Sequence, residues 1–205
     1  MALATYSDLQ TSIAAWLKRS DLTSIIPDFI TLAEARIARD LRLRKQIAST
    51  TLSTVAGTQG VTLPSDFLEA ENLTLPATSP PGALSVVTPE ILDRKFPEAY
   101  VTGQPRVYTV VGDKILFGPT PDAVYAVSLD YYQRWTALSA TPTNWLLTNH
   151  PNVYLFAALA EGAPYLMEDE RAPLWESKYQ ADVLRLQQMD DAALRSGSAM
   201  RVRTL

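Results

Sequence analysis

The chain contains one histidine, His150, and no cysteine, which limits the side chains available for acid–base or nucleophilic chemistry. A Ser/His/Asp triad would have to be built on His150, and no Gly-x-Ser-x-Gly motif accompanies it. His150 directly precedes Pro151, at the expected start of a helix, where capping or exposure to solvent is the simpler role. The sequence therefore predicts no catalytic residue, and a protein that is not an enzyme.

Metal and cofactor sites have as little support. Without cysteine, a metal site would depend on carboxylates, and the run Glu168-Asp169-Glu170 lacks the alternating spacing of a calcium loop. We interpret this run as a solvated acidic turn before a helix, whose N-terminus favours negative charge. The eight glycines form neither a dinucleotide-binding motif nor a P-loop. We expect no cofactor and no metal, although two acids brought together by the fold could still form a glycosidase-like pair.

Basic side chains gather in two segments, although the net charge of the chain is −4. The first segment, residues 36–45, includes Arg36, Arg39, Arg42 and Arg44. The second is the last eleven residues, which hold Arg195, Arg201 and Arg203 and end in Met200, Arg201, Val202, Arg203, Thr204 and Leu205. The rest of the surface is acidic and should repel nucleic acid, which argues against a general DNA-binding protein.

The first 45 residues predict two helices. Thr5 and Asp8 have the spacing of a capping box, and the first helical face that follows is Leu9, Ile13, Trp16 and Leu17. Pro27 suits the first turn of the second helix, because its missing N–H has no partner there. The apolar stripe of that helix is Phe29, Ile30, Ala33, Ile37 and Leu41. Arg36, Arg39 and Arg42 lie off this stripe, so we expect them to face solvent or a partner.

Between residues 46 and 135 the pattern changes to strands and turns. Strands are expected at 50–55, 61–64, 73–75, 84–87 and 124–132. Residues 106–117 predict a hairpin around Gly112-Asp113, and 89–96 predict a short helix capped by Thr88. Beyond this region the sequence returns to helix. One helix should open at Pro151, with Gly162 and Pro164 favouring a kink. Another should begin near Pro173 and bury Trp175, Tyr179, Val183, Leu186 and Met189.

These elements define an α+β fold. We expect a helical body with two N-terminal and two C-terminal helices (residues 1–45 and 136–195), an inserted β-rich domain (46–135) and a flexible C-terminal tail (196–205). No apolar run approaches the roughly 20 residues of a membrane span, and the N-terminus lacks the features of a leader. The expectation is a soluble, unprocessed chain.

Several segments, taken in order, resemble the adaptor proteins of tailed phages, especially those of short-tailed phages. They are AEARIARDLR at 33–42, LPSDFLE at 63–69, LFGPTP at 116–121, LDYY at 129–132, AALAEGAPYL at 157–166 and the aromatic helix with Trp175 and Tyr179. Each segment is weak alone, because any α+β protein could contain it. Their order along nearly the whole chain carries the resemblance.

The resemblance implies a structural component of the virion neck, assembled in the host cytoplasm as a ring of about twelve copies on the portal protein. Such an adaptor links the head to the tail nozzle or another downstream tail protein, and DNA passes through its channel without sequence-specific binding. Its C-terminal segment, here residues 200–205, would dock on the portal. The arginines 36, 39, 42 and 44 would contact a neighbouring subunit or the transiting DNA, and we favour the subunit contact.

Three other functions stay open at this point. A head-completion or stopper protein would also bind the portal but would close the DNA channel. A carbohydrate-binding or cell-wall-cleaving virion component belongs to a different class, and the β-rich region and the 22 acids leave room for it. A bacterial α+β binding domain without a phage role is the third. Portal binding separates the first from the other two.

Overall fold

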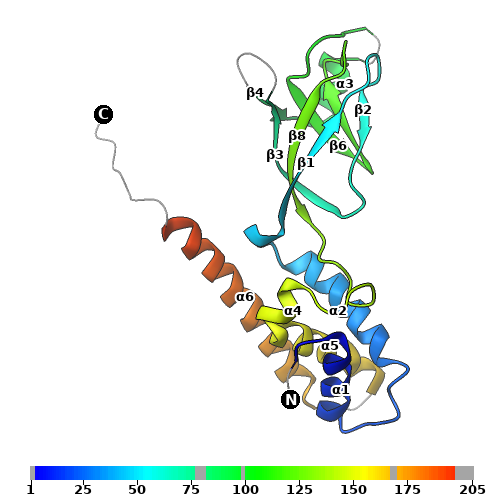
Figure 1. Cartoon of the computed structure of the whole chain (residues 1–205), viewed down its shortest axis with the longest axis vertical. Coiled ribbons are helices and arrows are strands. Elements are labelled where there is room, and N and C mark those ends of the chain that lie inside the picture. Colours follow the sequence, from blue (N-terminus) through cyan, green and yellow to red (C-terminus); the bar gives the residue numbers. More distant parts are fainter. Residues whose placement is uncertain (1–2, 77–81, 98–99, 167–169, 197–205) are drawn as a thin grey trace. The chain divides into compact units, whose positions relative to one another are not determined.

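A computed structural model describes residues 3–76, 82–97, 100–166 and 170–196, with the side chains of 194–196 left aside. The expected α+β class is confirmed. The chain divides into two compact units, which we treat separately. The helical unit comprises Met1–Arg44 and Trp135–Leu205, and the β unit comprises Lys45–Arg134. Figure 1 identifies the elements of each.

The helical unit is built around a central helix. Its elements are α1 (Tyr6–Leu17), α2 (Ile26–Asp40), α4 (Trp145–Asn149), α5 (Pro151–Leu166) and α6 (Ala172–Ser196). Helix α5 packs against each of the other four, and it is buried on more than one side, with Ala157, Ala158 and Leu159 fully inaccessible. A helix that is apolar around most of its circumference belongs inside a bundle. Figure 1 shows the last turns of α6, in red, extending beyond the other helices of this unit.

Local signals explain where these helices begin. The backbone N–H of Asp8 donates to Thr5 Oγ1 at 3.2 Å, and the N–H of Thr5 donates to Asp8 Oδ2 at 3.1 Å, so the predicted capping box is confirmed. Pro27 lies in the first turn of α2, as expected. Helix α4 was not predicted; Asn144 caps it by accepting a hydrogen bond from the N–H of Leu147.

Helix α5 runs without interruption through Gly162 and Pro164, where the sequence favoured a kink. Gly162 has a packing role: a Cβ atom there would lie 2.9 Å from Cδ2 of Phe29. The absence of a side chain therefore lets α2 approach α5 closely. Pro164 lies in the last turn of the helix, so the single i→i−4 hydrogen bond that its missing N–H removes lies close to the helix end.

The β unit contains two sheets that share one hydrophobic core. Its elements are β1 (Ile47–Ser53), β2 (Gly60–Thr62), β3 (Phe67–Leu75), β4 (Gly82–Ala83), β5 (Ser85–Val86), α3 (Pro89–Lys95), β6 (Val107–Val111), β7 (Lys114–Gly118) and β8 (Ala126–Gln133). The strand orders are β1-β8-β3-β4 and β2-β7-β6-β5. All pairs are antiparallel except β5 with β6. Leu129 from one sheet and Phe117 from the other are both fully buried in the shared core.

The β unit begins and ends on neighbouring strands. Ile47, the first residue of β1, pairs with Tyr132 of β8, and the N–H of Arg134 donates to the carbonyl of Asp66 at 2.7 Å. The expected hairpin is present as β6 and β7, with Gly112 at φ 61° in its turn. The expected short helix is α3, capped by Thr88.

Two apolar side chains lie outside the cores to which the sequence assigned them. Trp16 is 47% exposed and Met189 is 56% exposed. Trp16 lies at the edge of its helical face, where its ring meets Phe156 edge-on at 5.8 Å between centroids. Met189 lies beyond Leu186, the last buried residue of the apolar stripe of α6. Among the described helices, none is long and apolar enough to span a bilayer.

Candidate interaction surfaces

Arg36, which the sequence suggested would face solvent or a partner, is mostly buried and joins three helices of its own chain. Its side chain is 16% exposed, and its guanidinium lies within 3.4 Å of Asp40 on α2, 3.2 Å of Glu161 on α5 and 2.5 Å of Glu176 on α6. The guanidinium carbon also lies 4.3 Å from the ring centroid of Tyr179. A planar cation with several donors can satisfy such a set of acceptors at once.

The electrostatics of this cluster follow from its contacts. The hydrogen bond from Arg36 is the main reason why the pKa of Glu176 lies below its ordinary value. Burial, and then the hydrogen bond that its hydroxyl donates to Asp40 at 2.9 Å, raises the pKa of Tyr179. Both groups therefore hold their usual charge at neutral pH. The cluster is an internal clamp between helices. Two uncharged side chains of α6, Tyr179 and Gln187, add hydrogen bonds to Asp40 of α2.

Arg42 and Arg44 are also engaged within the subunit. Arg42 donates from Nη1 to the carbonyls of Ala38 and Leu41 at 2.5 and 2.9 Å, which satisfies carbonyl groups at the end of α2. Arg44 pairs with Asp190 of α6, with Nε to Oδ1 at 3.2 Å. Its backbone N–H donates to the other carboxylate oxygen at 3.0 Å.

Arg39 differs from the other three arginines. It is exposed in the last turn of α2, and within the described part of the chain it takes part in none of the hydrogen bonds or ion pairs. The predicted contact with a neighbouring subunit or with DNA is untested for all four arginines. The geometry leaves Arg39 as the member whose charge is available to a partner.

The sequence did not reveal the acids that engage these arginines. Glu161, Glu176 and Asp190 are far from residues 36–44 along the chain, so no local spacing connects them. The predicted portal-binding residues 200–205 lie outside the described residues, as do Glu168 and Asp169 of the acidic run.

His150 has a structural setting. It is the C-terminal cap residue of α4, where its backbone N–H donates to the carbonyl of Leu146 at 2.8 Å. Its ring lies 5.4 Å from the ring of Trp145, which in turn stacks on Trp135 at 5.6 Å. The sequence placed His150 at the start of the helix that opens at Pro151, whereas its cap hydrogen bond belongs to the end of the preceding helix, α4.

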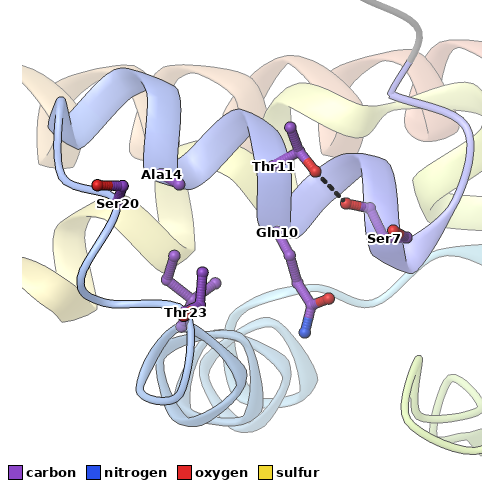
Figure 2. Close-up of a pocket in the computed structure, with 7 residues that line it drawn as sticks. Ser7, Gln10, Thr11, Ala14, Ser20 and Thr23 are labelled. Atoms are coloured by element: carbon purple, nitrogen blue, oxygen red, sulfur yellow. Dashed lines mark hydrogen bonds between the residues drawn. The ribbon is translucent and has the colours of Figure 1, made fainter.

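A shallow groove of about 270 Å³ lies between α1 and the start of α2 (Figure 2). The residues that line it are Ser7, Gln10, Thr11, Ala14, Ser20, Thr23 and Ile26. None of them is ionisable, and the hydroxyl of Thr11 donates to the carbonyl of Ser7 at 2.9 Å. The groove offers hydrogen-bonding and van der Waals contacts but no general acid or base. Among the described residues, no group of His, Asp and Glu is arranged to hold a metal ion.

The chain thus has a helical bundle joined internally by ion pairs and a small two-sheet unit, and among the described residues neither the groove nor the charged clusters offer a catalytic constellation. A family model described as SU10 adaptor protein matches residues 4–203, so the chain belongs to this family of phage head-to-tail adaptors. The match supports the resemblance drawn from the ordered segments. No curated protein matches the sequence.

Proposed function

We propose that this protein assembles as a ring on the phage portal and links the head to the tail nozzle, without catalysing a reaction. The match across residues 4–203 carries the proposal, because it includes both units and most of the C-terminal end. Family membership makes the chain a structural component of the virion. Portal binding, ring assembly and the attachment of a tail protein below are the finer steps that we infer.

The proposal is tested by light scattering coupled to size-exclusion chromatography, on the protein alone and after mixing with the portal protein of the same phage. We expect a monomer that converts to a ring-loaded portal complex, since premature rings would compete with assembly on the portal. A monomer that forms no complex with the portal would refute the proposal, and assays of glycan binding and cell-wall hydrolysis would then follow.

The C-terminal segment gives a prediction of its own. Residues 201–203 alternate arginine with valine, a pattern suited to an added strand or an acidic crevice on the portal. We expect deletion of residues 199–205 to abolish pull-down by the portal while leaving the thermal unfolding of the protein unchanged. The double variant with Arg201→Ala and Arg203→Ala should bind the portal more weakly. Its affinity should also fall less steeply with salt concentration than that of the wild type. Undiminished binding by the deletion variant would exclude this segment as the portal contact.

A further inference from the structure

Helix α6 carries a second, exposed stripe beside the face that it buries. Trp175, Tyr179, Val183 and Leu186 face the core. The exposed stripe, here called the α6 stripe, consists of Leu174, Ser177, Ala181, Leu184, Gln188 and Asp191. Its members recur at alternating steps of three and four residues, which is the spacing of a helix–helix seam. Leu174 and Leu184 are 54% and 55% exposed, so the seam has large apolar side chains and small ones between them.

Helix α2 has a comparable stripe. Asp28, Leu32, Ala35 and Arg39 are all exposed, and they follow one another at steps of four, three and four residues. We call this the α2 stripe. Leu32 is 51% exposed at its centre, Asp28 gives it an acidic beginning and Arg39 gives it a basic end. The opposite side of α2 is buried in the bundle, so the stripe is directed away from the core.

The two helices run in the same direction within one subunit. Their contacts advance along both helices together: Arg36 with Glu176, then Asp40 with Tyr179, then Arg44 just beyond α2 with Asp190. A rotation about an axis parallel to the helices leaves this direction unchanged. In a cyclic assembly with such an axis, α6 of one copy and α2 of the next are therefore parallel.

We propose that the α6 stripe of one copy packs against the α2 stripe of a second copy, in parallel and with Leu184 against Leu32. This inference rests on the proposed ring and identifies the contact between its neighbours. Arg39 and Asp191 each lie one heptad beyond those leucines, so the same register sets them opposite each other. Asp28 lies one turn before Leu32, and Lys178 flanks the α6 stripe. In this register the two residues differ in height along the helix axes by only about 3 Å.

Charge selects this direction. With Leu32 still opposite Leu184, an antiparallel arrangement would set Arg39 beside Lys178 and so bring two cations together. The parallel arrangement pairs opposite charges at both ends of the contact. Its apolar centre supplies attraction, while the charges fix register and partner. The contact joins two different surfaces, which is the requirement for a ring rather than a closed pair.

The absence of cysteine from the chain allows a direct test. Variants L32C and L184C are prepared separately, mixed in equal amounts, loaded on the portal and oxidised. We expect disulfide-linked dimers from the mixture and none from either variant alone, because facing positions on packed helices meet the distance that a disulfide requires. The variant that carries both substitutions should give a ladder of linked copies.

L174C is the matched control, because Leu174 is as exposed as Leu184 on the same helix but lies about 15 Å from it along the axis. Mixed with L32C, it should give no dimer. Dimers from L184C alone would show a two-fold contact between α6 helices and would overturn the inference. Ring-loaded portal without a link between positions 32 and 184 would also overturn it while leaving the proposed function standing. A wild-type protein that never joins the portal would instead refute the proposed function.

Charge reversal provides a second measurement that does not depend on oxidation. R39E and D191R should each lower the number of copies per portal, and the double variant should restore it, because the pair is then reversed rather than broken. R94E and D93R, at exposed positions of α3 in the β unit, are the controls and should bind as the wild type does. Failure of the double variant to recover would count against the Arg39–Asp191 pair.

Discussion

At the scale of single residues, Arg36 links three helices of the helical unit. It contacts carboxylates from α2, α5 and α6 while it is mostly buried. Removing the cation leaves these carboxylates close to one another with no counter-charge, which costs more than the loss of one bond.

We predict that Arg36→Met lowers the free energy of unfolding by about 1–2 kcal/mol, a figure reduced because the carboxylates are partly exposed. Denaturant titration followed by circular dichroism measures the change. Arg19→Met is the control: Arg19 also binds a carboxylate, that of Asp21 at 2.6 Å, but both side chains are more than half exposed. An equal effect from the two variants would mean that the internal clamp adds nothing beyond a surface pair.

The contribution of Glu34 to stability depends on pH. Its carboxylate accepts a hydrogen bond from the N–H of Leu138 at 2.7 Å, but burial outweighs this bond and raises the pKa of Glu34 above its ordinary value of 4.5. A raised folded-state pKa means that folding favours the protonated form. The stability associated with Glu34 is therefore fully present below pH 4.5 and is lost as the pH rises through the folded-state pKa.

Because Glu34→Gln keeps an acceptor for Leu138 and removes the charge, we predict that it raises the melting temperature at pH 7. The gain should shrink as the pH falls and should vanish below pH 4.5. Thermal melts of both proteins between pH 4 and pH 8 would show this. Glu34→Ala, which also removes the acceptor, should be destabilising at every pH. A gain from Glu34→Gln that is independent of pH would contradict the role given to ionisation.

At the scale of elements, the close packing of α2 on α5 depends on Gly162. Phe29, whose ring occupies the space where a side chain at 162 would lie, is itself 4% exposed and meets Tyr165 edge-on at 5.7 Å. The ring has little room to move.

We predict that Gly162→Ala destabilises the protein by about 1–3 kcal/mol, despite the better helix propensity of alanine, because the new methyl group overpacks this contact. The change is measured by chemical denaturation. Phe29→Leu in the same chain should recover part of the loss, and Gly82→Ala, where no atom lies within 4 Å of the added Cβ, should be neutral. A stabilising Gly162→Ala would show that α5 and α2 can separate at little cost.

The elements show which parts of this fold can be predicted from sequence. The capping box at Thr5, the hairpin at Gly112 and the apolar stripe of α2 depend on neighbours within a few residues, so their patterns are visible in the chain. The ion pairs of Arg36 and Arg44 join positions far apart in the chain, and only the packing of α6 on the bundle reveals them. Helix α4 was missed because its short sequence has no full apolar repeat.

At the scale of the whole molecule, each unit has a core of its own. The β unit buries Leu73, Ile115, Phe117, Val127 and Leu129 almost completely, and its two sheets pair strands from both ends of the segment. Such a unit meets the requirement for independent folding.

We predict that residues 45–134, produced alone, unfold in one cooperative thermal transition, as monitored by near-ultraviolet circular dichroism. The matched control is the same segment with Phe117→Ala, which removes a fully buried ring and should lower the melting temperature strongly. A segment that shows no cooperative transition would mean that the β unit needs the helical unit in order to fold.

The pairing of Ile47 with Tyr132 has an evolutionary consequence. Paired strands lie about 5 Å apart, so the β unit begins and ends on two adjacent strands at that spacing. Any other small domain whose ends lie on adjacent strands could be spliced into the same two points without redesign of the bundle. Recombination between phages could therefore exchange this module while the helical body is inherited unchanged.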